Sequence, residues 1–177
     1  SGKRTGARVL SDDAQFLAQA AGVHHPMELV NPICLESSLA PSIAAKITHR
    51  AIHLERVWKA FNVLTKTHEV LIVEGVGGLM VPILDRYFVA DMAQRMALPI
   101  VVVTLPTLGT INHTALTVAV ARQYGLEVRG LVASLLGDDY NYLGSDGNYY
   151  VGDTRWHSDG GWPRPIVYYK IALYLDP

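Results

Sequence analysis

Apolar residues recur at helical spacing in four parts of the chain. In the first, Phe16 and Leu17 follow Ser11, whose hydroxyl can accept a backbone N–H and so cap a helix. Acidic Asp12 and Asp13 come next, where the positive end of a helix favours them. The segments with this spacing are residues 11–22, 42–67 (one or two helices), 89–96 and 111–124.

Three short runs of mostly β-branched residues predict buried strands, at residues 70–73, 100–104 and 128–132. The first two runs are apolar on both faces, which is typical of a parallel sheet covered by helices, and Gly130 weakens the third. Strands and helices alternate along the chain, which indicates βαβ units. The predicted fold is therefore of the α/β class, a parallel sheet with flanking helices. Such sheets bind ligands at the carboxyl ends of their strands.

The composition changes near residue 136. Residues 137–177 hold nine of the fifteen aromatic residues, many glycines and a strand-like stretch over 166–175. This composition is typical of β-hairpins or of part of a β-barrel, and not of another βαβ unit. We therefore expect two regions, an α/β segment over residues 1–136 and a short β-rich, irregular tail over residues 137–177.

Composition narrows the possible partners. The 177 residues are 50 % hydrophobic with a formal net charge of −1, which excludes disorder for the bulk of the chain and argues against nucleic-acid binding through general basicity. The longest apolar runs fall short of the ~20 residues of a membrane span. The single cysteine excludes an internal disulfide and fits a reducing, cytoplasmic compartment. We expect a small-molecule substrate, and neither nucleic acid nor membrane as a partner.

The first candidate binding site is at Glu74, which follows the first apolar run and precedes Gly75, Gly77 and Gly78. A carboxylate at a strand end can hold Mg²⁺ together with water and phosphate oxygens. The glycines allow backbone N–H groups to approach an anion. The alternative is a tight turn with a solvated carboxylate, and spacing alone does not decide between the two.

These residues belong to a longer set of motifs that resembles dethiobiotin synthetase over residues 1–136, most specifically in the LGTINHT motif. The resemblance implies a fold of the P-loop NTPase class, and an enzyme of biotin biosynthesis that makes dethiobiotin from diaminopelargonic acid, CO₂ and ATP with Mg²⁺. It also implies a homodimer. The segments that carry it are residues 1–2, 11–14, 31–32, 40–45, 73–82, 90–92, 98–103 and 108–117.

The same resemblance implies roles for individual residues. Asp13 and Glu74 match the two acids associated with Mg²⁺. Four residues match substrate-binding positions: Ser1, Gly77, Gly78 and Asn112. Asn112 would reach the substrate carboxylate from the partner subunit. The alternative for this residue is a plain position at or near a helix cap.

Two departures from the family pattern concern the nucleotide. The 177 residues contain no G-x-x-x-x-G-K-[ST] loop, which in the family cradles the phosphates and supplies lysines. Ser134 stands where the family has an asparagine that reads adenine. We therefore assign no catalytic residue, expect an incomplete NTPase sheet, and expect no dethiobiotin synthesis by this chain alone.

The tail contains a second candidate site. His157 and Asp159 are two residues apart and would share a face of a strand, as do two members of a 2-His-1-carboxylate iron site. With residues 147–160 and 169–177, they resemble the phytanoyl-CoA dioxygenase family, which implies a double-stranded β-helix, Fe(II) and 2-oxoglutarate. A dioxygenase of this type and a non-catalytic dimerising module are the alternative functions.

Overall fold

The computed structural model describes residues 2–5, 8–37, 39–75, 77–104, 108–133, 142–143, 149–150 and 172–174. The chain divides into two compact units. The first contains Ser1–Leu71, Val81–Phe88 and Asp176–Pro177, and the second contains Ile72–Met80 and Val89–Leu175. The two units are described separately below.

The first unit begins its helical part with α1 (Asp12–Ala20), in agreement with the sequence. The Ser11 hydroxyl accepts the N–H of Ala14 at 3.3 Å and caps the helix. Gly22, just after the helix, has a φ of 66°, a conformation that L side chains rarely adopt. The other helices are α2 (Met27–Val30), α3 (Pro41–Ile47) and α4 (Leu54–Thr67). Residues 42–67 therefore form two helices, which is one of the two arrangements that the sequence predicts.

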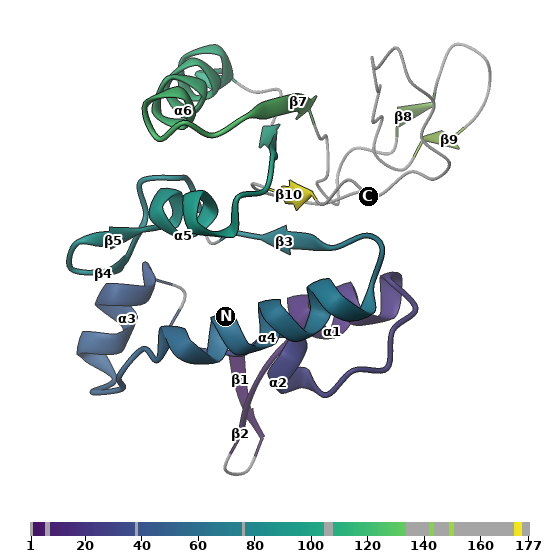
Figure 1. The fold of residues 1–177 in the computed structure, drawn as a ribbon, viewed down its shortest axis with the longest axis vertical. Helices are drawn as coiled ribbons and strands as arrows, with labels where there is room; N and C mark the ends of the chain where they lie inside the picture. The colour runs from purple at the N-terminus through teal and green to yellow at the C-terminus, as the bar shows by residue number, and fades with distance from the viewer. Residues whose placement is uncertain are drawn as a thin grey trace. The chain divides into compact units, whose positions relative to one another are not determined.

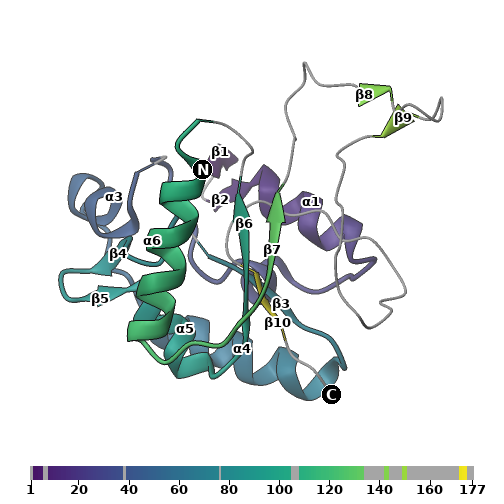
Figure 2. The same ribbon diagram turned by 90° about the horizontal axis from the view of Figure 1, so that it is seen from above.

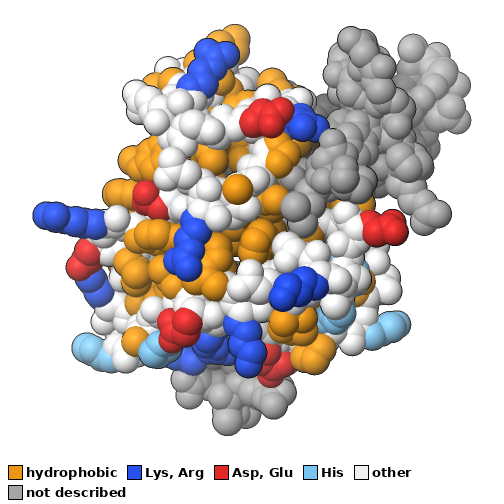
Figure 3. All heavy atoms as spheres, in the orientation of Figure 1, with side chains coloured by type: hydrophobic (Ala, Val, Ile, Leu, Met, Phe, Trp, Pro, Cys, Tyr) orange, Lys and Arg blue, Asp and Glu red, His pale blue; other side chains and the backbone are white. Residues whose placement is uncertain are grey.

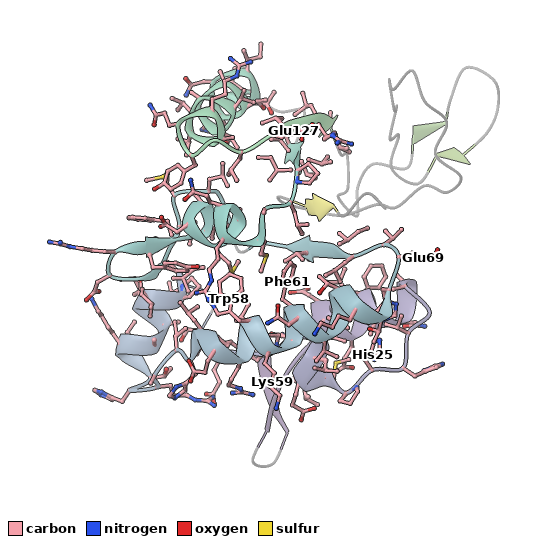
Figure 4. All side chains as sticks on the ribbon, viewed as in Figure 1. His25, Trp58, Lys59, Phe61, Glu69 and Glu127 are labelled. Carbon is pink, nitrogen blue, oxygen red and sulfur yellow. The ribbon has the colours of Figure 1, made fainter. Side chains whose placement is uncertain are left out.

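Helix α4 is amphipathic. Figure 4 shows Trp58 and Phe61 on one side of the helix and Lys59 on the other. The rings of Trp58 and Phe61 meet edge to face, with centroids 6.4 Å apart and planes at 87°. Ala60 is buried on the same helix. Burial of one face accounts for the stability of this helix better than its intrinsic propensity does.

Two antiparallel hairpins also belong to the first unit, and the sequence patterns predicted neither (Figure 1). Strands β1 (Gly2–Thr5) and β2 (Arg8–Ser11) form one, and β4 (Pro82–Leu84) and β5 (Tyr87–Phe88) form the other. Helix α3 packs against β4. Strands of two to four residues are too short to show the alternation by which strands are recognised in a sequence.

The second unit is built on a four-stranded sheet in the order β3-β10-β6-β7. Strands β6 and β7 pair in parallel, as Figure 2 shows. Strand β10 is antiparallel to both β3 and β6, so β3, β6 and β7 run in the same direction. The strands are β3 (Ile72–Glu74), β6 (Ile100–Thr104), β7 (Val128–Ala133) and β10 (Ala172–Tyr174). The α/β fold and its three co-directional strands are thus confirmed, although β3 begins two residues later than predicted.

The position of β10 corrects the expectation of a purely parallel sheet. Ala172 pairs with both Glu74 of β3 and Val101 of β6, so the sheet is mixed and not purely parallel. The physical reason is that β3 and β6 each present a row of backbone N–H and C=O groups, which a strand between them satisfies. Hydrophobic periodicity marks a strand but does not identify its partners.

Helices α5 (Val89–Met96) and α6 (Thr110–Gln123) complete the second unit and match the predicted helices closely. Helix α6 packs against β6 and β7. Ile100 and Val89 are the largest fully buried side chains among the described residues. A separate short antiparallel pair, β8 (Tyr142–Leu143) and β9 (Tyr149–Tyr150), lies farther along the chain.

The described surface carries charges of both signs. Figure 3 shows acidic and basic side chains interspersed on the face in view, as the net charge of −1 leads one to expect. Within the described part of the chain, none of the helices combines the length and the apolar character that crossing a membrane requires.

Candidate functional site

The candidate site lies at the carboxyl edge of the sheet in the second unit. Glu74 is the last residue of β3, and Thr104 is the last residue of β6. Because the two strands run in the same direction, both residues face the same edge of the sheet. Glu74 and Val101 share Ala172 as pairing partner, so β6 extends three residues farther towards that edge. This is the edge at which α/β folds bind ligands.

The loop after Glu74 leaves room beside its backbone. Gly77 has a φ of 69°, which a residue with a side chain rarely adopts. A Cβ atom built on Gly78 would meet no other atom within 4 Å. The space next to Gly78 is therefore open, and it leaves room for a ligand group to approach the backbone.

A cluster of threonine hydroxyls joins the end of β6 to the start of α6. The Thr104 and Thr110 hydroxyls are hydrogen-bonded to each other, and the Thr114 hydroxyl donates to the Thr104 hydroxyl at 3.5 Å. The N-cap residue is Gly109, with a φ of 94° and no side chain to cap the helix. The first N–H groups of α6 have no acceptor within the helix, so they are available to a negatively charged group.

Asn112 is the third residue of α6 and is exposed. Gly109, and not Asn112, is the cap residue, and no side chain forms a capping hydrogen bond at this end. The structure thus places Asn112 in the first turn of the helix that starts at the same sheet edge as Glu74. An amide in this position can add a hydrogen bond to those of the backbone N–H groups.

Comparison with known proteins identifies the family. A sequence model of the AAA domain family matches residues 3–148, which is most of the chain. The chain belongs to the AAA domain family.

The curated proteins to which the chain is similar include several named ATP-dependent dethiobiotin synthetase BioD. The chain is 40 % identical to the protein of Thermodesulfovibrio yellowstonii over 131 residues, 70 % of this chain and 55 % of the relative. It is 38 % identical to that of Methanococcus vannielii over 127 residues, 72 % of this chain and 60 % of the relative. It is 40 % identical to the protein of Anaeromyxobacter dehalogenans over 127 residues, which are 72 % of this chain and 57 % of the relative. These matches confirm the resemblance to dethiobiotin synthetase, and the chain spans 55–60 % of the length of these relatives.

The predicted site residues that the structure describes do not all belong to the same unit. Glu74, Gly77, Gly78 and Asn112 belong to the second unit, whereas Asp13 lies in the first turn of α1 in the first unit. The other predicted residues, Ser1, Ser134, His157 and Asp159, lie outside the described residues. The iron and 2-oxoglutarate site therefore stays a prediction.

Glu74 fits the donor set that Mg²⁺ prefers. Mg²⁺ takes one or two protein carboxylates and completes its octahedron with water and phosphate oxygens. Glu74 offers a carboxylate at the end of β3, and the open space at Gly78 follows in the next loop. Among the described residues, no group of three His, Cys, Asp or Glu side chains could hold a metal ion as a set. The described part of the chain therefore fits a Mg²⁺ site in which a protein carboxylate and water are the ligands, and not one in which protein side chains supply every ligand.

Sequence reasoning missed the hydroxyl cluster of Thr104, Thr110 and Thr114. Its signal was present, because Thr110 and Thr114 are four residues apart and so share a helix face, and Thr104 ends the preceding strand. Sequence reasoning also missed a contact between His25 and His68 in the first unit. No motif connects these two histidines, which are 43 positions apart.

Proposed function

We propose that the chain provides the metal- and substrate-binding edge of a dethiobiotin synthetase, which joins diaminopelargonic acid and CO₂ in an ATP- and Mg²⁺-dependent ring closure. One observation carries the proposal: Glu74, the glycines after it and the first turn of α6 share one edge of one sheet. The names of the similar proteins support the same reaction.

Each residue has a part in this proposal. Glu74 holds Mg²⁺, which when bound neutralises charge on the phosphate oxygens of ATP. Asp13, in the first unit, matches the second Mg²⁺-associated acid by the family resemblance alone. The backbone at Gly77 and Gly78 approaches the substrate. Asn112 and the uncapped N–H groups of α6 bind the substrate carboxylate, which a helix N-terminus favours. Ser1 contacts the diamine, as the family resemblance implies.

The proposal separates binding from turnover. The 177 residues contain no G-x-x-x-x-G-K-[ST] loop, so we propose that they bind the diamine without catalysing its ring closure. Isothermal titration with diaminopelargonic acid tests binding, with Asn112→Ala expected to weaken it and Gln123→Ala, at the far end of α6, as the control. Phosphate release with ATP, diamine and bicarbonate tests turnover. Lack of diamine binding refutes the site, and phosphate release dependent on the diamine refutes the inactivity.

We also propose a homodimer that uses the start of α6. Leu108 is 104 % exposed, Ile111 is 85 % exposed and Leu116 is 57 % exposed. Several large apolar side chains exposed along one short segment favour a protein interface. The same observation favours the second candidate function, a non-catalytic dimerising module.

Light scattering of the purified chain tests the dimer. We expect twice the chain mass for the wild type and a shift to the single mass for Leu116→Asp. The matched control is Gln123→Asp, an exposed position at the other end of the same helix. A wild-type chain of single mass at high concentration contradicts the dimer. Diamine binding by the dimer favours the enzyme role, and dimerisation without diamine binding favours the module.

A further inference from the structure

Two histidine side chains meet within the first unit, away from the proposed magnesium site. The Nε2 atoms of His25 and His68 are 2.6 Å apart. Their rings are nearly perpendicular, at 88°, with centroids 4.9 Å apart. Both rings are partly buried and so remain within reach of small solutes. The pair therefore presents two imidazole nitrogens to one point in space.

The backbone on each side holds these rings in place. His25 precedes Pro26, which restricts His25 to an extended backbone and is the N-cap residue of α2. His68 is the cap residue at the end of α4, and its N–H donates to the carbonyl of Leu64 at 3.1 Å. Helices α2 and α4 pack against each other. The two nitrogens are thus brought together by the fold of the unit and not by proximity in the sequence.

The chemistry of the pair suits a transition metal. Without a metal, one Nε2 must donate a proton to the other, because two N–H groups or two lone pairs facing each other repel. Tetrahedral Zn²⁺ with Zn–N bonds of about 2.0–2.1 Å separates two ligand nitrogens by about 3.3 Å, so an opening of about 0.7 Å admits the ion. His68 also lies at the carboxyl end of α4, where the helix dipole favours a cation.

We propose that His25 and His68 bind a divalent transition metal ion such as Zn²⁺ through their Nε2 atoms. Imidazole prefers zinc, nickel and copper, whereas Mg²⁺ prefers oxygen ligands, so this site differs chemically from the one at Glu74. In the described part of the chain no third His, Cys, Asp or Glu completes a larger set, and water takes the remaining positions. The proposal does not depend on the dethiobiotin synthetase function.

Isothermal titration of the full 177-residue chain with zinc chloride tests the site. We expect His25→Gln and His68→Gln each to weaken zinc binding by at least about tenfold, because each removes one of two protein ligands. The matched controls are His24→Gln, the exposed neighbour of His25, and His53→Gln, which faces Glu55 at the other end of α4. These should change binding less than about twofold. Equal losses in all four variants indicate scattered surface binding and overturn the proposal.

A measurement on the wild-type chain keeps the test valid if a variant fails to fold. Diethyl pyrocarbonate modifies accessible imidazole nitrogens, and peptide masses report which histidines have reacted. Zinc should protect His25 and His68 from modification and leave His24 and His53 reactive. Bound Cu²⁺ should show hyperfine splitting from two nitrogens in its electron paramagnetic resonance spectrum. Lack of protection at His25 and His68 overturns the proposal even where zinc binds.

Discussion

The two units differ in what they bury. Among the described residues, the buried apolar side chains of the first unit are four alanines and Ile83. Those of the second unit include branched and large residues around β6. They are Leu79, Val89, Ala90, Ala93, Met96, Leu98, Ile100, Val102, Ala121, Leu126 and Val132.

The difference shows where each unit obtains its stability. Burial of large apolar side chains contributes the most to folding, at roughly 25 cal/mol for each Å² removed from water. The first unit buries little of this kind and relies more on the Ser11 cap of α1, on its hairpins and on polar contacts such as His25–His68. We therefore expect the first unit to open locally before the second does.

The largest effect is expected in the core of the second unit. Ile100→Ala should lower the free energy of unfolding by about 2–5 kcal/mol, because Ile100 is fully buried and its removal leaves a cavity. Urea unfolding followed by circular dichroism measures the loss. The control is Leu131→Ala on β7, where the side chain is 54 % exposed and the change should stay within about 0.5 kcal/mol. Equal losses at the two positions would remove the basis of the comparison.

A change at the sheet edge should affect ligand binding and not stability. Glu74→Gln should weaken Mg²⁺ binding at least about tenfold, or about 1.4 kcal/mol, because an amide lacks the charge of the carboxylate. Titration with Mg²⁺, or with Mn²⁺ followed by its resonance signal, measures the affinity. Glu127→Gln is the control, since Glu127 pairs with Arg129 away from this site. If Glu74→Gln and the control bind alike, Glu74 is not a ligand.

The helix cap of the first unit gives the next effect in size. Ser11→Ala should cost about 1 kcal/mol, because it removes the acceptor for the Ala14 N–H. Thermal unfolding and amide exchange over α1 measure the loss. Gln15→Ala, at an exposed position of the same helix, should have almost none. An unchanged exchange rate in Ser11→Ala would show that the first unit does not depend on its caps.

A surface ion pair should contribute less. Lys46 and Asp85 are 2.7 Å apart across a groove between α3 and the β4–β5 hairpin, with side chains 65 % and 76 % exposed. Such pairs contribute about 0–1 kcal/mol and weaken with salt. A double-mutant cycle of Lys46→Ala and Asp85→Ala, at low and high salt, measures the coupling. A coupling well above this range would give the first unit a source of stability other than burial.

The smallest expected change concerns reactivity. Burial raises the pKa of the Cys34 thiol, and the charge of Arg50 opposes this more weakly. A raised pKa leaves less thiolate at any given pH, so iodoacetamide should alkylate Cys34 more slowly at pH 8 than it alkylates the urea-unfolded chain. Mass spectrometry of timed samples gives both rates. Equal rates would mean that the first unit does not enclose this side chain.

Local patterns predicted much of the fold. The β-branched run at residues 100–104 and the helix at 89–96 match β6 and α5, because both patterns are set by neighbouring residues. The position of β10 could not be predicted, because it depends on backbone groups of β3 and β6 that are distant in sequence. The two hairpins were missed because their strands are too short to show a period.

The same distinction applies to the site. The rule that parallel sheets bind ligands at the carboxyl ends of their strands pointed to the edge where Glu74 lies, and in the structure α6 starts at the same edge. The hydroxyl bond between Thr104 and Thr110 requires side-chain geometry that no pattern carries. The contact of His25 with His68 depends on how α2 and α4 pack. Sequence patterns therefore locate a site on a fold better than they describe its side-chain contacts.

The central strand β10 has a consequence for how fast the sheet can form. Leu173 pairs with Val73, 100 positions earlier, and with Ile100. Closing loops of this length costs chain entropy before the pairing returns any free energy, and folding rates fall as such distant contacts become more important. During synthesis, β3 and β6 emerge well before the strand that separates them. Until β10 arrives, each strand has an unpaired edge, so this period is the one in which the chain is most exposed to mispairing.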